Sequence, residues 1–372
     1  MDNSLSLTTD RLRSDQYSKA SGYLGLLRAT GLGILCLLAG CASYPQPWIS
    51  YKDTFLEEGR IIDTGNNNIS HSEGQGYGLL LALLFDDQES FKEIWQWTKS
   101  RLQIREDALF AWKWEKTENH SYQVTDKNNA TDGDLLIALA LSLAAKQWYQ
   151  DVYMEESNKI SSAILKHLTL SVGQDQWVLL PAEYGFQKEQ NIAFNPSYQI
   201  LKAYQVLAAS PDQTQWHQIS RTAEKFINSS LNPATRLPPD WITFNYHKQT
   251  FGNELNTHWP TKRNYFGDEA IRVFLYQLWK PKLVLEPTYL FREFESTGQI
   301  SRFIESETSE TSKEALAGYY AILAINASRL GKDRLAQALL ERAKQKLESE
   351  KGDYYSHTLY LLAIMSDQQV LL

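Results

Sequence analysis

The chain has 372 residues, 43% of them hydrophobic and 22% charged, which suffices for the core of one large domain or of two ordinary ones. Its net charge of −7 argues against a nucleic-acid partner, which usually calls for a basic patch. Eleven Trp and 20 Tyr are many for this length. Most of them are expected in the core, but flat aromatic faces also suit a cleft that binds sugar rings.

The first 40 residues are predicted to be a targeting segment. An apolar run over 29–38 follows Arg28 and is too short to span a bilayer comfortably. It ends in Leu38-Ala39-Gly40-Cys41, which resembles a bacterial lipobox, where the cysteine is acylated after cleavage before it. Because Cys36 is the only other cysteine, a mature chain beginning at Cys41 has no thiol left for a disulfide or a Cys-ligated zinc site.

This motif predicts the domain order and the location. We expect a lipoprotein signal peptide over 1–40, a tether over 41–50 and a single catalytic domain over 51–372. Ala42, and not Asp, follows Cys41, which in the usual sorting logic favours the outer membrane. The protein is therefore expected in the periplasm, attached to the membrane only through lipid.

Beyond the tether, apolar runs of helical length recur and strand-like alternation is scarce. Helical spacing is clear at Leu316, Tyr319, Tyr320 and Leu323. Helices are expected over 77–98, 135–149, 160–170, 198–209, 216–228, 270–279, 312–330, 334–347 and 354–365, and strands over 177–180 and 241–246. These helices are too apolar for a loose array and too numerous for a four-helix bundle. An all-α fold built as a closed ring of helical hairpins fits best.

Four polar segments that bear Gly or Pro each run directly into an apolar helix. They cover 72–78, 130–134, 195–198 and 267–270. Ser, Thr, Asp and Asn often cap helix starts, so capping is a sufficient explanation for each segment alone. In a ring, however, alternate helices open on the same face. All four segments are then expected to converge on one cleft rich in carboxylates.

Paired carboxyl groups in such a cleft suit glycoside hydrolysis. Hydrolysis with inversion needs a protonated carboxyl for the leaving oxygen and an ionised one, roughly 6.5–9.5 Å away, to activate water. Glu73 is the candidate acid, and glycines at 74, 76 and 78 leave room for a substrate to approach. A helix N-terminus favours the ionised carboxyl, whereas an acid must be protonated. Asp132 is the natural like charge to reverse that preference.

The segment Ala130-Thr131-Asp132-Gly133-Asp134, continued by Ile137, Ala138, Ala140, Leu141, Ala144 and Trp148, resembles the signature of glycoside hydrolase family 8. Ser142 departs from it, standing where a small apolar residue is usual. The segment over 72–78 resembles the one that holds the family's general acid, and 111–114, 180–181, 195–198 and 239–241 also match in order and spacing. The resemblance covers essentially the whole chain after the tether. It is greatest to the periplasmic endoglucanases that accompany bacterial cellulose synthases.

The resemblance implies an (α/α)6 barrel, an inverting endo-β-1,4-glucanase mechanism without cofactor or metal, and a long cleft for a β-1,4-linked polysaccharide. The implied roles are Glu73 as acid and Asp132 as the group that holds and distorts the sugar. Trp114 would stack on a distant sugar, Tyr198 would lie near the attacked carbon and Arg272 would orient the base. Further substrate-binding residues are expected within the matching segments, namely Gln75, Tyr77 and Asn195.

The catalytic base is open between two neighbours. Relatives carry Tyr-Asp-Ala-x-Arg, whereas this chain has Asp268-Glu269-Ala270-Ile271-Arg272. Neighbouring residues of a helix point about 100° apart, so only one of the two is expected to face the cleft. Glu269 has the ungapped match and the three-residue spacing to Arg272, and it is the preferred candidate. Asp268 is the better N-cap by residue type.

The sequence leaves some alternative functions open and argues against others. The seven histidines are scattered and form no His-Glu-x-x-His, which argues against a metal enzyme. The stretch over 126–134 resembles a calcium loop only superficially, because Ile137 stands where the closing Glu would be needed. A non-catalytic carbohydrate-binding lipoprotein, or the same enzyme fold acting on xylan or chitosan, stays possible. The cellulose synthase machinery is the expected partner if the substrate is cellulose.

Overall fold

Helices dominate the computed structural model, which describes residues 45–209, 213–252, 265–305, 313–367 and 371. Six inner helices are α2 (Ser72–Leu84), α4 (Thr131–Trp148), α6 (Leu201–Leu207), α8 (Ile271–Tyr276), α10 (Ala317–Arg329) and α12 (Tyr354–Ile364). Six outer helices are α1 (Gln46–Phe55), α3 (Gln88–Arg101), α5 (Asp151–Leu168), α7 (Gln213–Ser229), α9 (Thr288–Thr297) and α11 (Asp333–Ser349). Cys41 and the predicted signal peptide over 1–40 lie outside the described residues.

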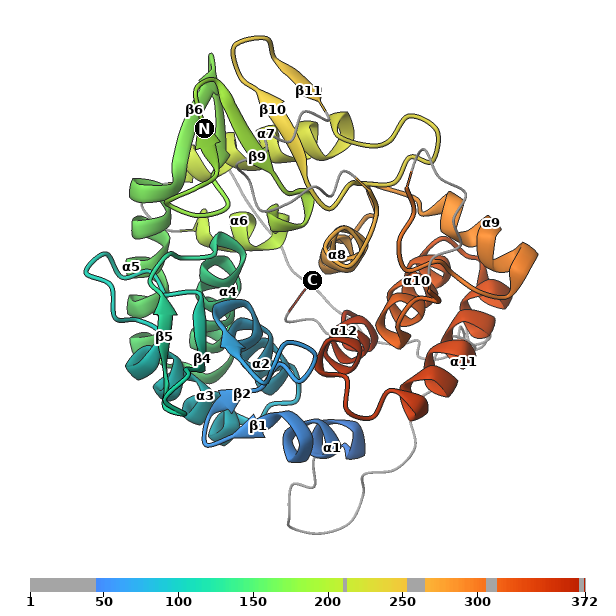
Figure 1. Ribbon diagram of the computed structural model, residues 1–372, viewed down its shortest axis with the longest axis horizontal. Helices are drawn as coiled ribbons and strands as arrows, with labels where there is room; N and C mark the ends of the chain where they lie inside the picture. Colours follow the sequence, from blue (N-terminus) through green and yellow to red (C-terminus); the bar gives the residue numbers. More distant parts are fainter. Residues whose placement is uncertain (1–44, 210–212, 253–264, 306–312, 368–370, 372) are drawn as a thin grey trace, which may run out of the picture. The chain divides into compact units, whose positions relative to one another are not determined.

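The inner helices form a ring because they are apolar on nearly every side. Almost every residue of α2, α4 and α12 is buried, whereas α11 buries only Leu339 and Ala343. Helix α2 packs on α4, α4 on α6, α8 on α10 and α10 on α12, and α12 returns to α2 (Figure 1). This arrangement is an (α/α)6 barrel, as predicted. Within the described part of the chain, no helix combines the length and apolarity needed to cross a membrane.

Short antiparallel strands extend the loops that join the helices. They are β1 (Leu56–Glu57) with β2 (Arg60–Ile61), β3 (Ser70–His71) with β4 (Lys113–Lys116) and β5 (Tyr122–Asp126), β6 (Thr169–Gly173) with β7 (Gln176–Leu179), and β8 (Gln187–Lys188) with β9 (Asn191–Phe194), β10 (Ile242–Asn245) and β11 (Thr250–Gly252). The two predicted strands are confirmed as β7 and β10. The other strands were not predicted, and five of them span only two or three residues, too few for an alternation.

Several helix boundaries differ from the prediction: the helix expected over 160–170 begins at Asp151, and the one expected over 312–330 begins at Ala317. The stretch expected as one helix over 77–98 is split, because Asp86 adopts a left-handed φ of 54° and the Asp87 side chain accepts the Ser90 N–H to start α3. The predicted tether over 41–50 is too long, since α1 begins at Gln46. Trp48 in α1 is fully buried and donates its indole N–H to Asp87 at 2.9 Å. Burial of such a side chain contributes about 1.5–3 kcal/mol, which anchors α1 to the barrel.

Candidate active site

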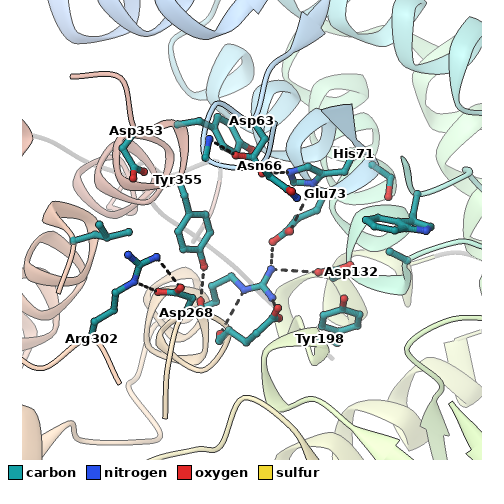
Figure 2. Close-up of a pocket in the computed structure, with 18 residues that line it drawn as sticks. Asp63, Asn66, His71, Glu73, Asp132, Tyr198, Asp268, Arg302, Asp353 and Tyr355 are labelled. Carbon is teal, nitrogen blue, oxygen red and sulfur yellow. Dashed lines mark hydrogen bonds and ion pairs between the residues drawn. The ribbon is translucent and has the colours of Figure 1, made fainter. Parts of the chain in front are cut away.

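A cavity of about 380 Å³ lies where the inner helices begin. The four segments predicted to converge all line it, through Glu73, Asp132, Tyr198 and Glu269 among others. The starts of the two remaining inner helices also contribute. The lining residues are Asp63, Gly65, Asn66, His71, Ser72, Glu73, Trp112, Ala130, Asp132, Tyr198, Asp268, Glu269, Arg272, Arg302, Leu316, Asp353, Tyr354 and Tyr355 (Figure 2). The convergence predicted from the helix starts is confirmed.

Arg272 is the centre of the cavity's charge network. Its guanidinium Nη1 contacts Glu73 Oε1 and lies 3.3 Å from Asp132 Oδ2, while Nη2 contacts Glu269 Oε2. The contact with Glu269 is the one that the three-residue spacing predicted. Three carboxyl groups from three inner helices or their starts therefore share one cation, whose side chain is only 3% exposed. Such an excess of acidic groups in a poorly solvated place favours the binding of a proton by one of them.

Asp132 is the most buried of these carboxyl groups. Burial raises its pKa well above the usual value, and the nearby Glu269 carboxylate raises the pKa further, although the Gly133 N–H bonded at 2.8 Å acts in the opposite direction. Tyr198 lies close by, with the Arg272 guanidinium 5.8 Å from its ring centre. Burial and the Asp132 charge hold the pKa of Tyr198 well above its usual value, so its hydroxyl stays neutral and available as a hydrogen-bond donor.

Asp268 and Glu269 both line the cavity, so the prediction that only one would face it is wrong. Asp268 does not cap the helix start. Instead, Asp240 Oδ1 accepts the N–H groups of Glu269 at 3.1 Å and Ala270 at 2.8 Å. This leaves the Asp268 side chain able to turn toward a partner on another segment. Arg302 binds it with two hydrogen bonds of 2.8 Å, as Figure 2 shows.

The comparison with known proteins agrees with this geometry. Residues 26–369 match the family described as glycosyl hydrolases family 8. The chain belongs to this family. It is 34% identical to a probable endoglucanase of Novacetimonas hansenii, over 86% of this chain and 90% of that protein.

Solved structures of endoglucanases resemble the barrel. An endo-1,4-D-glucanase of Vibrio fischeri ES114 superposes with a TM-score of 0.75 at 26% identity, covering 86% of this chain and 93% of that one. An endo-β-1,4-glucanase of Acetobacter xylinum superposes with a TM-score of 0.72 at 31% identity, covering 88% of this chain and 98% of that one.

Three residues expected to bind substrate in this family 8 chain lie elsewhere. Gln75 is fully buried, and its side chain bonds to the backbone of Gly59 and Ile61 and to the Thr98 hydroxyl. Tyr77 is also fully buried, and its hydroxyl lies 2.5 Å from that of Tyr276. A helix turns about 100° per residue, which aims both side chains into the barrel wall, although the Tyr77 hydroxyl also accepts a hydrogen bond from Arg272 Nη1 at 3.5 Å. Contact of either residue with substrate stays a prediction.

Asn195, the third of these residues, does not line the cavity but binds Glu269, the candidate base. Its amide Nδ2 donates to Glu269 Oε2 at 3.0 Å, and its Oδ1 accepts the Ser197 N–H at 2.8 Å. The side chain is 1% exposed. Asn195 therefore fixes the orientation of Glu269.

Two glycines of the segment over 72–78, which contains Glu73, allow close helix packing. A Cβ at Gly76 would lie 2.6 Å from Leu136 Cβ, and a Cβ at Gly78 would lie 2.6 Å from Ile61. These positions therefore allow α2 to approach its neighbours, and the expectation that they admit the substrate was wrong.

Trp112 lines the cavity, and the stacking of Trp114 on a more distant sugar stays a prediction. The Trp114 ring packs edge-on against Trp97, with 5.7 Å between ring centres, and does not line the cavity. The two tryptophans are separated by an irregularity in the pairing of β4 with β5 between Lys113 and Trp114. A bulge of this kind re-aims side chains, which a sequence pattern does not show.

Several lining residues were missed by the sequence analysis. The pattern used for the other helix starts would have found some, because 352–355 is a Gly-bearing polar segment that runs into α12. Its Asp353 side chain caps that helix by accepting the Ser356 N–H at 2.8 Å. Asp63 and Arg302 had no such signal, since both stand in irregular segments and neither adjoins a helix start.

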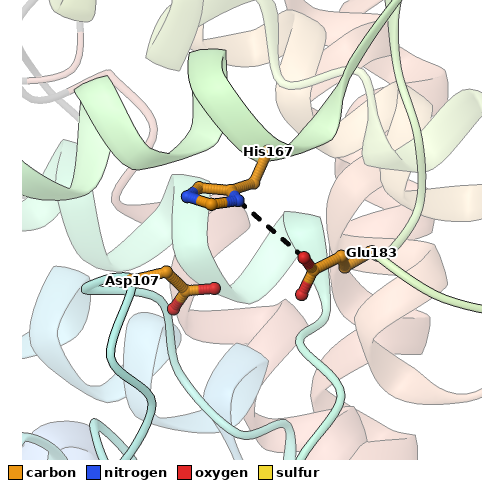
Figure 3. Close-up of side chains that lie close together, drawn as sticks. All are labelled: Asp107, His167 and Glu183. Carbon is orange, nitrogen blue, oxygen red and sulfur yellow. Dashed lines mark ion pairs between the residues drawn. The ribbon is translucent and has the colours of Figure 1, made fainter.

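A second group of acidic and histidine side chains lies outside this cavity. Among the described residues, Asp107, His167 and Glu183 place potential metal ligands within 4.8 Å of one another (Figure 3). Arg105 donates to both carboxylates, however, so its guanidinium already supplies the positive charge. His167 Nδ1 lies 3.8 Å from Glu183. The arrangement is an ion-pair network that ties α5 to two neighbouring loops.

Proposed function

We propose that this family 8 protein is an inverting endo-β-1,4-glucanase that hydrolyses cellulose or a related β-glucan. The endoglucanase names of relatives at about 30% identity support this activity. The observation that carries the proposal is the meeting of Glu73, Asp132 and Glu269 on the one guanidinium of Arg272, inside a cavity built from the helix starts. No cofactor is expected, because one protonated and one ionised carboxyl suffice for inverting hydrolysis.

The proposed reaction begins with Glu73 protonated. Its proton passes to the glycosidic oxygen as the bond from that oxygen to the anomeric carbon breaks. Glu269 takes a proton from a water molecule, whose oxygen bonds to the anomeric carbon from the opposite face. The product therefore first appears as the α-anomer. Asp132 holds the sugar ring in a distorted form, and Arg272 orients Glu269 and compensates the negative charge.

The contacts of the two adjacent acidic residues favour Glu269 as the base. Both oxygens of Asp268 accept a hydrogen bond from Arg302, and the Tyr319 hydroxyl adds a third at 2.7 Å. These three bonds occupy both oxygens of Asp268 and hold its side chain toward Arg302 and Tyr319. The donors from Asn195 and Arg272, in contrast, converge on Oε2 of Glu269.

Paired substitutions test these assignments. Glu73→Gln keeps the shape but removes the transferable proton, so turnover on unactivated glucan should fall by a factor of about 10² or more. Glu269→Gln and Asp268→Asn are then compared, with the product anomer followed by NMR. Loss of activity in Asp268→Asn alone would reassign the base. A β-anomeric first product would refute inversion, and absence of reducing sugar from soluble cellulose would refute the glucanase itself.

We also propose that the protein is periplasmic and anchored to the outer membrane through Cys41, which lies outside the described residues. The lipobox-like segment over 38–41 and the Ala at 42 support this proposal. A diacylglyceryl thioether plus an amide-linked chain exceeds the two signals that stable anchoring requires. Mass spectrometry of the mature N-terminus checks it, and an unmodified N-terminus would refute it. The similarity to endoglucanases that accompany cellulose synthases supports that machinery as the partner.

A further inference from the structure

His71, the residue at the start of α2, contacts both the helix and the cavity. Its ring Nδ1 accepts the Gly74 N–H at 3.0 Å, which makes it the N-cap of α2. On the other side of the ring, Nε2 lies 3.4 Å from Asp63 Oδ2 (Figure 2). Because Nδ1 accepts a hydrogen bond, the ring proton is assigned to Nε2, facing Asp63. The cap of this helix is therefore an uncharged imidazole.

The surroundings fix the ring in this orientation. Asp63 is itself held, since its Oδ1 accepts the Gly65 N–H at 3.0 Å and its own N–H donates to Ile69 at 2.8 Å. The ring of Tyr354 packs edge-on against the imidazole at 6.1 Å. A Cβ at Gly74 would come within 3.3 Å of the imidazole and 2.9 Å of the Tyr354 hydroxyl. Glycine at this position therefore allows the ring to reach the helix end.

The start of α4 provides an internal comparison. Both helices have a carboxylic residue at their second position, followed by glycine: Glu73-Gly74 in α2 and Asp132-Gly133 in α4. Ala130 precedes α4 and offers no side-chain cap, and there the Asp132 carboxylate accepts the Gly133 N–H at 2.8 Å. In α2 the equivalent N–H is taken by His71, whose Nδ1 lies 3.8 Å from Glu73 Oε2. The residue that caps the helix therefore decides which side chain accepts the hydrogen bond from this N–H group.

We propose that His71 is a positioning residue for the general acid: as an uncharged cap it occupies the Gly74 N–H that the Glu73 carboxylate would otherwise accept, and it thereby keeps Glu73 protonatable. The physical reason is that free N–H groups at a helix start stabilise an ionised carboxyl. A general acid must begin each turnover with its proton. This inference rests on the proposed glucanase function, with Glu73 as its acid.

Other charged groups also act on Glu73. Arg272 favours the ionised form, and Asp132 opposes it from α4. The remaining charged groups and the tyrosines that face the cavity are Asp63, Asp268, Glu269, Arg302, Asp353, Tyr198, Tyr354 and Tyr355. All of these are unchanged in a substitution at 71. A comparison of an uncapped with a neutral-capped variant therefore isolates the effect of the cap.

The test is the pH dependence of kcat/KM on soluble cellulose for His71→Ala and His71→Asn. Alanine removes the cap and makes the start of α2 resemble that of α4. The alkaline limb, where the acid loses its proton, should then move to lower pH by roughly half to one unit, a 3- to 10-fold loss of rate on that limb. Asparagine is an uncharged cap of comparable quality and should keep the limb in place.

A second readout separates this role from a structural one. An aryl β-cellotrioside with a dinitrophenolate leaving group needs no proton from Glu73. His71→Ala should therefore cleave it within about twofold of the unchanged protein, even at a pH where cellulose hydrolysis has fallen 3- to 10-fold. Equal loss on both substrates would overturn the inference. Thermal unfolding of both variants shows how much stability the cap itself provides.

The outcomes are distinct. Coincident alkaline limbs for His71→Ala and the unchanged protein would overturn the inference, and so would an equal shift in His71→Asn, because the imidazole and not the cap would then matter. Full activity of Glu73→Gln would overturn the proposed acid and this inference with it. A shift in His71→Ala alone, with the aryl substrate spared, supports the proposal.

Discussion

Two arginines of this chain bind carboxylates from separated segments, and the two clusters behave differently. In the cavity, Arg272 contacts Glu73, Asp132 and Glu269. In the second cluster, Arg105 contacts only two, Asp107 and Glu183. The arginine side chains are 3% and 9% exposed, so burial of the cation does not distinguish them.

The difference lies in the number of carboxyl groups around each arginine and in the burial of Asp132, whose side chain is 2% exposed. Burial acts to raise the pKa of Asp107, but hydrogen bonds from Arg105 and from the Leu109 N–H outweigh it and lower the pKa. For Asp132, burial and the Glu269 charge prevail, and its pKa is raised. Arg105 and its two carboxylates form a structural ion-pair network. Arg272 cannot neutralise three carboxyl groups, so one of them can hold a proton. Substitutions at four residues test this distinction.

Removal of the cation from the cavity should have the largest effect. Arg272→Met leaves three carboxyl groups without a counter-ion, so the free energy of unfolding should fall by about 3–5 kcal/mol. Turnover should fall by about 10²–10³, as expected for loss of a preorganised electrostatic group. Steady-state kinetics and urea unfolding measure both effects. Arg272→Lys retains the charge but not the planar fork, so it should regain stability more than activity. Activity of Arg272→Met within tenfold of the unchanged protein would contradict this view of the cavity.

Matched substitutions of the acids should give the next largest difference. Asp132→Asn removes the carboxyl group proposed to hold the strained sugar and should lower turnover by about 10². Asp107→Asn, at the second cluster, should leave turnover within about twofold. Both are measured on soluble cellulose under the same conditions. Unchanged turnover in Asp132→Asn would mean that Asp132 serves only as the acceptor for the Gly133 N–H.

The contributions of Asp132 and Asp107 to the free energy of unfolding should also depend on pH in opposite directions. The raised pKa of Asp132 means that its ionisation opposes folding, so its contribution is most favourable below 3.8 and is lost as the pH rises through the folded value. The lowered pKa of Asp107 means that its contribution is present above 3.8 and is lost as the pH falls through the folded value. Urea unfolding from pH 3 to 8 gives the free energy of unfolding as a function of pH. Asp132→Asn should reduce this pH dependence above pH 4. Asp107→Asn should flatten it below pH 4, and changes in the same region for both would refute the distinction.

The smallest effect is expected for Arg105→Met. Neither of its two acids is as buried as Asp132, since their side chains are 13% and 23% exposed against 2% for Asp132, so water compensates part of the lost charge. Stability should fall by about 1–2 kcal/mol and glucan hydrolysis should not change. Thermal unfolding and a reducing-sugar assay measure the two quantities. A loss of activity beyond threefold would show that this network supports the cleft.

Much of the barrel and of the site could be predicted from the sequence because the signals are local. Helical periodicity identified the inner helices, and the polar segments before them located Glu73, Asp132, Tyr198 and Glu269. The three-residue spacing to Arg272 placed that guanidinium beside Glu269, since residues three apart share a helix face. The strands other than β7 and β10, together with α1 and α9, gave no comparable local pattern and were missed.

Only the tertiary structure decided in which direction the side chains near the helix starts point. Asp268 faces the cavity because Arg302, 34 residues away, binds it, while Asp240 takes over the backbone N–H groups that Asp268 was expected to cap. The same holds for His71, whose role depends on Asp63 across an irregular loop. Local sequence determines which backbone donors exist at a helix start, but the acceptor that fills each one is chosen by whichever side chain the fold brings within hydrogen-bond distance.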